Sequence, residues 1–284
     1  MTDALSKKVE QAIKLIQSAS KIASEHNQPL ELCYSGGKDS DVILELAKMS
    51  GVEFRAIYKN TTIDPPGTIA HALRKNIEIV QPQRNFQQLI AKHGLPNRWR
   101  RFCCGYLKEY KILDYAIVGI RRDESRARAN RYKEPENCRI YSKKERVRQY
   151  MPILTWTSED VAQFIKERDI KCHSLYYDDK GDFHPERRLG CMCCPLLSRK
   201  KRIESFKEFP LMLRFYIRGA QRYIDSHPDC KIAKLFKGNV YDWITSQIFC
   251  DGYTQFSQQF GETMFGNDAI DTKQFLQEQF NIKL

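Results

Sequence analysis

A glycine-containing segment, residues 35–40, has the residue types of an anion-binding loop. Two glycines let the backbone approach an anion closely, two serines supply hydroxyl donors, and Lys38 supplies a point charge. Asp39 could orient the loop or help to hold Mg²⁺. The spacing differs from the GxxxxGK[ST] loop of P-loop NTPases. An ordinary turn would account for the two glycines alone. The whole pattern predicts a phosphate site with Lys38 and Asp39 as catalytic candidates, made of Ser35, Gly36, Gly37, Lys38, Asp39 and Ser40.

Clustered cysteines form a second candidate site. Cys103 and Cys104 are adjacent, and residues 191–194 contain a Cys-x-x-Cys pattern with a third cysteine inside it. Two close pairs of thiolates can hold Zn²⁺ or a [4Fe-4S] cluster. Adjacent cysteines suit tetrahedral zinc poorly, because a two-residue spacer normally lets both sulfurs turn inward. Cys193 either replaces Cys194 as a ligand or stays free as a reactive thiol and catalytic candidate. The predicted ligands are Cys103, Cys104, Cys191 and Cys194.

Five arginines between residues 121 and 131 follow an apolar stretch. In a doubly wound sheet the carboxyl ends of the strands border the ligand crevice, where guanidinium groups could clamp phosphates. A solvated basic loop is the alternative, and it describes Arg128 and Arg131 better than Arg121 and Arg122.

Hydrophobic periodicity predicts strands and helices that alternate through the first 120 residues. The predicted strands are 30–34, 53–58, 77–81 and 113–120, and the helices between them are 5–25, 41–49, 67–75 and 86–93. This alternation predicts an α/β fold with a doubly wound, mostly parallel sheet. Helices without strand signals are expected later, at 158–168, 199–208, 210–225 and 240–249. We therefore expect a domain over residues 1–198 and a helical C-terminal portion over residues 199–284.

Positive charge is concentrated in two segments. The chain carries +12 in total, of which residues 98–148 hold +9 and residues 187–222 hold +8, so the remainder carries −5. Local basic segments suit a polyanion such as nucleic acid, or a phosphate-rich nucleotide. Ordinary solvated faces are an equally good interpretation of either segment taken singly.

The N-terminal residues mix charged and apolar side chains at helical spacing, so they do not resemble a signal peptide, and no stretch approaches a membrane span. Ten cysteines in such a chain fit metal ligation or thiol chemistry better than a disulfide framework. We expect a cytoplasmic protein without membrane association. The isolated cysteines are interpreted as structural, namely Cys33, Cys138, Cys172, Cys230 and Cys250.

Five elements, in order, resemble motifs of the phosphoadenosine phosphosulfate (PAPS) reductase family within the N-type ATP pyrophosphatase superfamily. They are the Ser-Gly-Gly loop at 35–40, a threonine-containing segment at 60–68, Cys-Cys plus Leu-Lys at 101–108, Gly-x-Arg-x-x-Glu-Ser at 119–126, and the segment 152–161. The resemblance implies an adenine nucleotide α-hydrolase-like fold. It also implies a [4Fe-4S] cluster on the four cysteines, as in cluster-bearing members, and nucleotide contacts from Thr61, Arg121, Arg122 and Ser125.

These features together favour cleavage of ATP between its α- and β-phosphates. An acceptor oxygen would attack the α-phosphorus of Mg-ATP, pyrophosphate would leave, and sulfur from the cluster or a cysteine persulfide would then displace AMP. Among relatives this resembles the ATP pyrophosphatases of DNA phosphorothioation systems and, more distantly, tRNA-thiolating enzymes. The resemblance implies a nucleic acid acceptor and a sulfur donor such as a cysteine desulfurase.

Other functions remain open. Sulfonucleotide reductases attack the substrate's sulfur with a cysteine in a C-terminal Glu-Cys-Gly-Leu/Ile-His tail, which this sequence lacks, since its last cysteine is Cys250. Reduction of PAPS or adenosine phosphosulfate is therefore an alternative that would need Cys193 as the nucleophile. A non-catalytic nucleotide- or DNA-binding component is another. An adenylyltransferase like the FAD synthetases is a further option, but it has no evident need for the cysteines.

Overall fold

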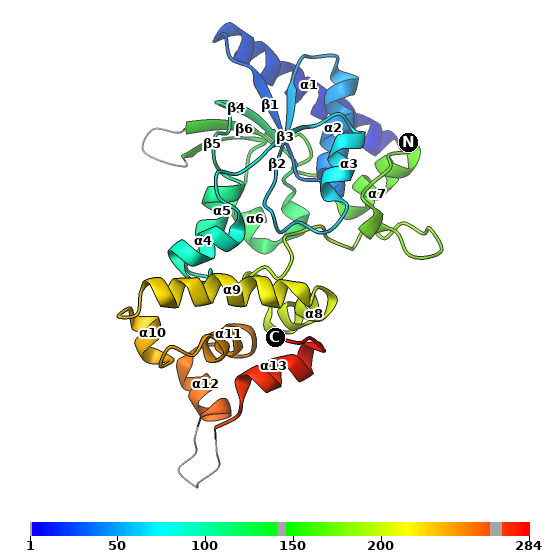
Figure 1. Cartoon of the computed structure of the whole chain (residues 1–284). Coiled ribbons are helices and arrows are strands. Elements are labelled where there is room, and N and C mark those ends of the chain that lie inside the picture. Colours follow the sequence, from blue (N-terminus) through cyan, green and yellow to red (C-terminus); the bar gives the residue numbers. More distant parts are fainter. Residues whose placement is uncertain (1, 141–145, 262–268) are drawn as a thin grey trace. The chain divides into compact units, whose positions relative to one another are not determined.

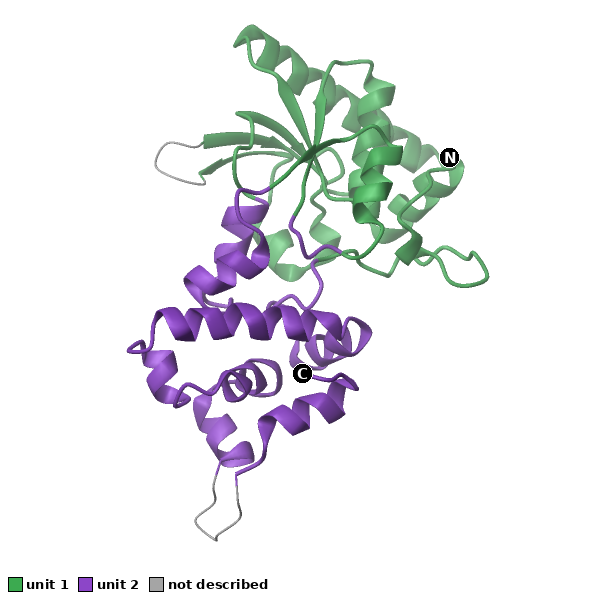
Figure 2. Cartoon of the chain, in the orientation of Figure 1, with its two compact units in different colours: residues 1–60, 65–81, 109–190 green, residues 61–64, 82–108, 191–284 purple. Residues whose placement is uncertain are grey.

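The computed structural model describes residues 2–140, 146–261 and 269–284. The chain forms two compact units whose segments interleave along the sequence (Figure 2). Unit 1 comprises residues 1–60, 65–81 and 109–190, and unit 2 comprises residues 61–64, 82–108 and 191–284. The helices expected after residue 198 all belong to unit 2, whose last segment starts at residue 191 and which also takes in two earlier stretches of the chain, 61–64 and 82–108. The division into a domain over residues 1–198 and a helical portion over residues 199–284 stays a prediction.

Unit 1 is built on a six-stranded sheet with strand order β3-β2-β1-β4-β6-β5 (Figure 1). Neighbouring strands are parallel, except that β5 and β6 form an antiparallel pair at one edge. The strands are β1 (Leu30–Tyr34), β2 (Arg55–Lys59), β3 (Glu78–Val80), β4 (Tyr115–Val118), β5 (Glu136–Ile140) and β6 (Arg146–Tyr150). The predicted α/β fold with a mostly parallel sheet is confirmed.

Helices of unit 1 pack on the sheet through apolar stripes. Helix α1 (Asp3–Glu25) begins at its N-cap Thr2, whose side chain accepts a hydrogen bond from the backbone N–H of Leu5. Its buried residues recur every three or four positions and join α2 (Lys38–Ser50) and β1 in one core. The remaining helical elements of unit 1 are α3 (Thr68–Arg74), η1 (Arg122–Glu124), α6 (Arg126–Arg131), α7 (Ser158–Glu167) and η2 (Ser174–Tyr176).

The strand order creates a switch point between β1 and β4. From β1 the chain proceeds through β2 to β3 on one side, whereas β4 is followed by β6 and β5 on the other side. Ligands of open α/β sheets bind outside the carboxyl ends of the strands at such a point. The residues that leave β1 and β4 are the Ser-Gly-Gly loop and the segment beginning at Gly119. The fold therefore places both predicted phosphate-binding segments at the same edge of the sheet.

All the regular structure in the described part of unit 2 is helical. Its helices are α4 (Phe86–His93), α5 (Phe102–Leu107), α8 (Arg199–Glu208), α9 (Leu211–Ser226), α10 (Lys231–Leu235), α11 (Val240–Phe249), α12 (Tyr253–Phe260) and α13 (Thr272–Phe280). Aromatic side chains fill much of its core, where Tyr216 contacts both Phe86 and Phe206. In neither unit does the described part of the chain contain a helix with the length and apolar character needed to cross a membrane.

Helices α4 and α9 pack tightly at Gly219. A Cβ atom at this position would lie 2.9 Å from the Cβ and Cγ2 atoms of Ile90 and 3.2 Å from the carbonyl oxygen of Gln87. Overpacking of this kind typically costs about 1–3 kcal/mol. We expect Gly219→Ala to lower the denaturant concentration at the midpoint of unfolding, although alanine favours helix formation.

The matched control is Gly105→Ala in α5, where an added Cβ would meet no atom within 4 Å. This variant should unfold at the same denaturant concentration as the parent protein or a higher one. Equal midpoints for Gly219→Ala and the parent would contradict the tight packing of α9 on α4.

Candidate functional site

The Ser-Gly-Gly loop has the backbone geometry of an anion-binding turn. Gly36 has a φ angle of 77°, and a Cβ atom there would lie 2.8 Å from Cγ2 of Thr68, so glycine is required. Helix α2 starts directly after its N-cap Gly37, which has no side chain to cap that end, while the N–H of Lys38 donates to the hydroxyl of Tyr176. The positive dipole end of this 13-residue helix therefore lies at the loop, where it favours an anion.

Gly119 allows the segment after β4 to approach this loop. A Cβ atom on Gly119 would lie 3.2 Å from the backbone carbonyl carbon and oxygen of Asp39. The approach brings Arg121 against the start of α2, where its Nε donates to Oδ1 of Asp39 at 2.7 Å. The Arg121 side chain is almost fully buried. A buried guanidinium needs a carboxylate partner, which Asp39 supplies.

Further groups of unit 1 contact Arg121. Its Nη1 lies 3.2 Å from Oδ2 of Asp123 and 3.4 Å from Oγ of Ser158. Hydrogen bonds from Ser158 and the charge of Arg121 lower the pKa of Asp123, so this carboxylate stays ionised at neutral pH. These contacts fix the guanidinium orientation beside the loop.

Lys38 adds a second positive charge to the loop. Its side chain is 4% exposed, and its Nζ lies 3.7 Å from Oδ2 of Asp39. Burial lowers the pKa of Lys38, the positive charges of Arg121 and Arg188 lower it further, and Asp39 opposes the shift. Three cations thus act on one small region, in which Asp39 and Asp123 are paired carboxylates. Binding of a phosphate would relieve the repulsion among them.

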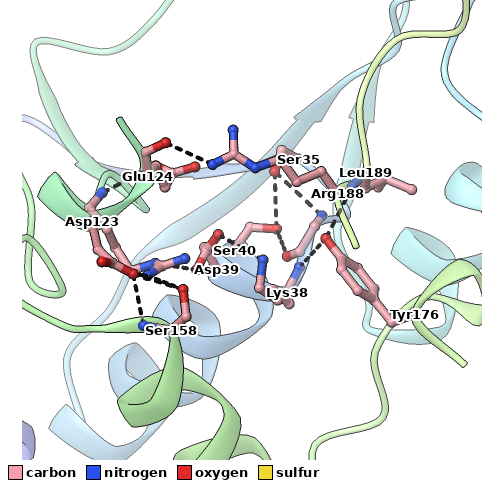
Figure 3. Close-up of polar contacts among 12 residues, drawn as sticks. Ser35, Lys38, Asp39, Ser40, Asp123, Glu124, Ser158, Tyr176, Arg188 and Leu189 are labelled. Atoms are coloured by element: carbon pink, nitrogen blue, oxygen red, sulfur yellow. Dashed lines mark hydrogen bonds and ion pairs between the residues drawn. The ribbon is translucent and has the colours of Figure 1, made fainter. Parts of the chain in front are cut away.

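Two residues of this site, Tyr176 and Arg188, were not predicted from the sequence. The phenolic oxygen of Tyr176 accepts hydrogen bonds from the backbone N–H groups of Lys38 and Leu189, both at 3.2 Å. Burial raises the pKa of Tyr176 to about 12, so it binds there as a neutral hydroxyl. Arg188 donates from Nη2 to the carbonyl oxygen of Glu124 at 2.8 Å (Figure 3). The excess of arginine around residues 187 and 188 was the available signal, but nothing local linked it to the loop.

The other predicted nucleotide contacts have different surroundings. Arg122 donates from Nε to the carbonyl oxygen of Tyr132 at 2.8 Å, and the Ser125 side chain caps α6 by accepting from Arg128 N–H. Thr61 belongs to unit 2, where it is buried and its Oγ1 accepts a hydrogen bond from the backbone N–H of Ile63. Roles of Arg122, Ser125 and Thr61 in nucleotide binding stay predictions.

The four predicted cysteine ligands all lie in unit 2 and are free thiols. Cys103 and Cys104 are on α5, and Cys191 and Cys194 are on the segment before α8. A hydrogen bond with Cys104 raises the pKa of Cys103, as do burial and the neighbouring charges of Cys191 and Cys194. The four thiols therefore share one neighbourhood, although they come from segments separated by more than 80 residues.

Positive groups accompany these thiols. Arg101 donates from Nη2 to Sγ of Cys104 at 3.8 Å, and together with the hydrogen bond from Cys103 it lowers the pKa of Cys104 to about 6. Burial lowers the pKa of Lys108, but the adjacent Cys191 and Asp64 outweigh that effect and raise it. Thiolate is the form that binds metals, and nearby cations favour it.

The four cysteine sulfurs are chemically suited to bind a cluster of several metal ions. Within residues 2–140, 146–261 and 269–284, no three His, Cys, Asp or Glu side chains are placed to hold one metal ion. A four-iron cubane separates its ligating sulfurs more widely than a single ion does. Four free thiols in one neighbourhood, with Arg101 and Lys108 beside them, match the thiolate donors and the negative charge of such a cluster.

Cys193 is distinct from the four thiols around it. Its side chain is 1% exposed, and its backbone has a φ angle of 53°, in the left-handed region. The backbone N–H donates to Oγ of Ser205 at 3.0 Å, and the carbonyl oxygen accepts from the hydroxyl of Tyr216 at 3.0 Å. Burial raises the pKa of Cys193 to about 12, so the thiol is protonated at neutral pH. Its predicted role as an attacking thiol stays a prediction.

Comparison with known proteins identifies the group to which this architecture belongs. Residues 29–197 match the phosphoadenosine phosphosulfate reductase domain. The chain belongs to the PAPS reductase family. The match includes the loop, the arginine segment and all four cysteines, so the predicted family is confirmed.

Individual members of the family show moderate similarity. An uncharacterized protein of Methanocaldococcus jannaschii is 27% identical over 236 residues, which cover 78% of this chain and 54% of that protein. Sulfate adenylyltransferase subunit 2 of Psychromonas ingrahamii is 28% identical and covers 58% of this chain, which spans 65% of its length. The PAPS reductase of Candida auris matches 67% of this chain and 95% of its own, at 17% identity and a TM-score of 0.44. The chain thus spans about half to two thirds of the length of these two sequence relatives.

The lowered pKa of Lys38 predicts how nucleotide binding depends on pH. A lysine with a lowered pKa loses its proton at a lower pH than an ordinary lysine, so ATP affinity should begin to fall early in the alkaline range. Lys38→Ala should weaken binding roughly 10- to 100-fold near neutral pH, because one charged hydrogen bond is lost. Calorimetric titration with ATP between neutral and alkaline pH measures both effects.

Lys38→Arg is the matched control, because a guanidinium stays charged over this range. Its affinity should depend less on pH than that of the parent protein. If the parent and Lys38→Ala gave the same affinity at every pH, Lys38 would not contact the phosphates.

Proposed function

We propose that this protein is an ATP pyrophosphatase that adenylylates an acceptor for iron-sulfur-dependent sulfur insertion. The acceptor that we propose is a nucleic acid. The observation that carries the proposal is the start of α2 behind Gly37, where Lys38, Asp39 and Arg121 form one compact charged group at the positive end of the helix. This arrangement suits the pyrophosphate portion of ATP, which carries most of its negative charge.

The same residues explain why ATP would be cleaved between its α- and β-phosphates. With the β- and γ-phosphates on the loop, an acceptor oxygen attacks the α-phosphorus and forms a new P–O bond, while the bond to the β-phosphate breaks and pyrophosphate leaves. Negative charge develops on the leaving group, where Lys38 and the α2 N–H groups lie. Arg121 positions Asp39 and adds positive charge. Mg²⁺ brought with ATP would be held by Asp39 and by the phosphates themselves.

Sulfur chemistry is assigned to unit 2. Cys103, Cys104, Cys191 and Cys194 would hold the [4Fe-4S] cluster, and Arg101 and Lys108 would offset its negative charge. When bound, the cluster would hold the sulfur that displaces AMP from the activated acceptor. A sulfur donor such as a cysteine desulfurase would supply it as a persulfide, and a thiol reductant would supply the two electrons that bring this sulfur to the sulfide level. Activation and sulfur supply would thus be divided between the two units.

Two observations support an adenylylated acceptor of nucleic acid type. The relative from Psychromonas ingrahamii is named a sulfate adenylyltransferase subunit, and transfer of an adenylyl group from ATP requires the same α,β-cleavage. The positive charge of this chain is concentrated in residues 98–148 and 187–222, as a polyanionic acceptor requires. Residues 141–145 of the first segment lie outside the described residues.

Reduction of PAPS or adenosine phosphosulfate is the second candidate, favoured by the name of the family domain. It would require a thiolate to attack the substrate's sulfur, and the buried, protonated thiol of Cys193 is poorly suited to that step. A non-catalytic component would bind ATP without turnover. The three functions differ in their products, so one assay separates them.

The test is pyrophosphate release from Mg-ATP by anaerobically purified protein, with and without single-stranded DNA or RNA. We expect release that increases when nucleic acid is added and that falls at least a hundredfold in Lys38→Ala, because transition-state charge stabilisation is lost. Lys48→Ala, an exposed position at the other end of α2, is the matched control and should keep parental activity. Sulfite from PAPS or adenosine phosphosulfate with no pyrophosphate from ATP would establish the reductase instead.

The cluster proposal predicts the effect of single cysteine substitutions. Cys103→Ser, Cys104→Ser, Cys191→Ser and Cys194→Ser should each reduce bound iron and the visible absorbance of the anaerobically purified protein. Cys138→Ser, at an exposed thiol of β5, should change neither. Stoichiometric zinc with negligible iron in the parent protein would contradict the assignment.

A further inference from the structure

Trp99 is an exposed aromatic side chain in unit 2. Its side chain is 96% exposed, whereas the other two tryptophans, Trp156 and Trp243, are 1% and 4% exposed. An indole has the largest apolar surface of any side chain, and its planar face is a stacking surface for another flat ring. Exposure this complete at one position, among arginines, indicates a surface that binds a ligand.

A side-chain turn fixes the backbone that carries Trp99. Oδ1 of Asn97 accepts hydrogen bonds from the backbone N–H groups of Trp99 at 2.9 Å and of Arg100 at 2.8 Å. The N–H of Asn97 donates in return to the carbonyl oxygen of Arg100 at 3.3 Å. The turn connects α4 to α5, and Leu95 before it is buried. The indole is therefore presented from a closed turn, which reduces the entropy lost when it binds.

Positive side chains surround the turn. Arg98 donates from Nη2 to the carbonyl oxygen of Leu197 at 3.4 Å, which links the turn to the segment just before α8. Lys200 and Lys201 in the first turn of α8 are exposed and form no ion pair with any residue that the structure describes. The guanidinium of Arg100 lies 6.0 Å from the centre of the Phe102 ring. Phosphates on both sides of a stacked base could bind these charges.

Other basic residues nearby have structural partners. Arg199 pairs with Asp251 and donates to Gln255, and Arg202 donates to the carbonyl oxygen of Ile248. These bonds hold α8 within unit 2. Arg98, Arg100, Lys200 and Lys201, by contrast, form no ion pair with any residue that the structure describes, so their charges can bind an anionic ligand.

Trp99 and the four basic residues Arg98, Arg100, Lys200 and Lys201 are called the patch below. Along the sequence, both parts of the patch lie close to the predicted cysteine ligands. Trp99 lies three residues before α5, which carries Cys103 and Cys104, and Lys200 follows Cys194 by six residues. We propose that Trp99 stacks on an unpaired base of a single-stranded nucleic acid whose phosphates bind Arg98, Arg100, Lys200 and Lys201. This inference rests on the proposed function, for which it defines the acceptor as a strand with an unstacked base. A duplex offers no free base face, so it should bind less tightly.

The experiment is equilibrium binding of fluorescent oligonucleotides, single-stranded DNA, single-stranded RNA and duplex DNA, to the full chain without ATP. Trp99→Ala should weaken single-strand binding roughly 5- to 100-fold, because base stacking on an aromatic side chain contributes this much. Trp99→Phe should restore part of the affinity. The double variant Lys200→Ala/Lys201→Ala should bind with a weaker dependence on salt. The slope of the logarithm of the binding constant against the logarithm of the salt concentration should become shallower by about 0.7 for each phosphate that the protein no longer neutralises.

Leu211→Ala and Lys231→Ala are the matched controls, since both side chains are exposed in unit 2 outside the patch. They should leave affinity and salt dependence unchanged. Because Trp156 and Trp243 are buried, quenching of tryptophan emission by an unlabelled single strand should disappear in Trp99→Ala. This readout reports contact with the base and not only a change in stability.

Unchanged single-strand affinity in Trp99→Ala would overturn the inference, as would tighter binding to duplex than to single strands. If Trp99 serves a protein partner instead, oligonucleotide binding will not depend on it. The assay needs no catalysis, so Trp99-dependent binding without pyrophosphate release would reject the proposed function and keep this inference. Pyrophosphate release together with oligonucleotide binding that does not depend on Trp99 would support the proposed function and reject this inference.

Discussion

The ion pair between Asp39 and Arg121 holds the candidate nucleotide site of unit 1 together. It joins residues 82 positions apart, at the carboxyl ends of the two strands that flank the switch point of the sheet. Because Arg121 is buried, removing Asp39 would leave its guanidinium with Asp123 as the remaining carboxylate partner that the structure shows. The close approach of the two segments involves Gly119, where an added Cβ would lie 3.2 Å from the Asp39 backbone, so that backbone would have to shift.

Local sequence signals located the elements that carry this pair. The strand predicted at 30–34 and the helices at 86–93, 199–208 and 240–249 have the predicted bounds. Each of these helices begins directly after a residue whose side chain caps it, namely Asn85, Ser198 and Asn239. Strands β5 and β6 were missed, since both are short and rich in polar residues; β5 is the edge strand, and β6 lies between β4 and β5. Helix α5 was missed as well, because its sequence contains a glycine and two cysteines in place of an apolar stripe.

Some residues of the candidate site could be predicted from local sequence, whereas others are revealed only by the tertiary fold. Lys38, Asp39 and Arg121 could be named from the sequence because a turn between strand and helix is a local feature. Tyr176 and Arg188 reach the loop from more than 130 residues away, so only the tertiary fold shows their role. The same applies to the division of the chain, because residues 61–64 and 82–108 join unit 2 although periodicity alone assigns them to the α/β portion.

The distribution of chemistry between the two units follows from this division. The phosphate loop and its partners belong to unit 1, whereas the four thiols, their positive neighbours and Trp99 belong to unit 2. An enzyme that activates an acceptor with ATP and then adds sulfur needs both sets of groups. The interleaved chain builds each set from several separate segments, so the loss of either set should leave the other intact.

The most direct test of the account follows the label from ATP labelled at the α-phosphate, incubated with anaerobic protein and single-stranded nucleic acid. The account predicts label in AMP or on the acceptor, with unlabelled pyrophosphate released in equal amount. Label in ADP, with inorganic phosphate released, would show β,γ-cleavage and would contradict the assignment of the Ser-Gly-Gly loop as a pyrophosphate-binding site.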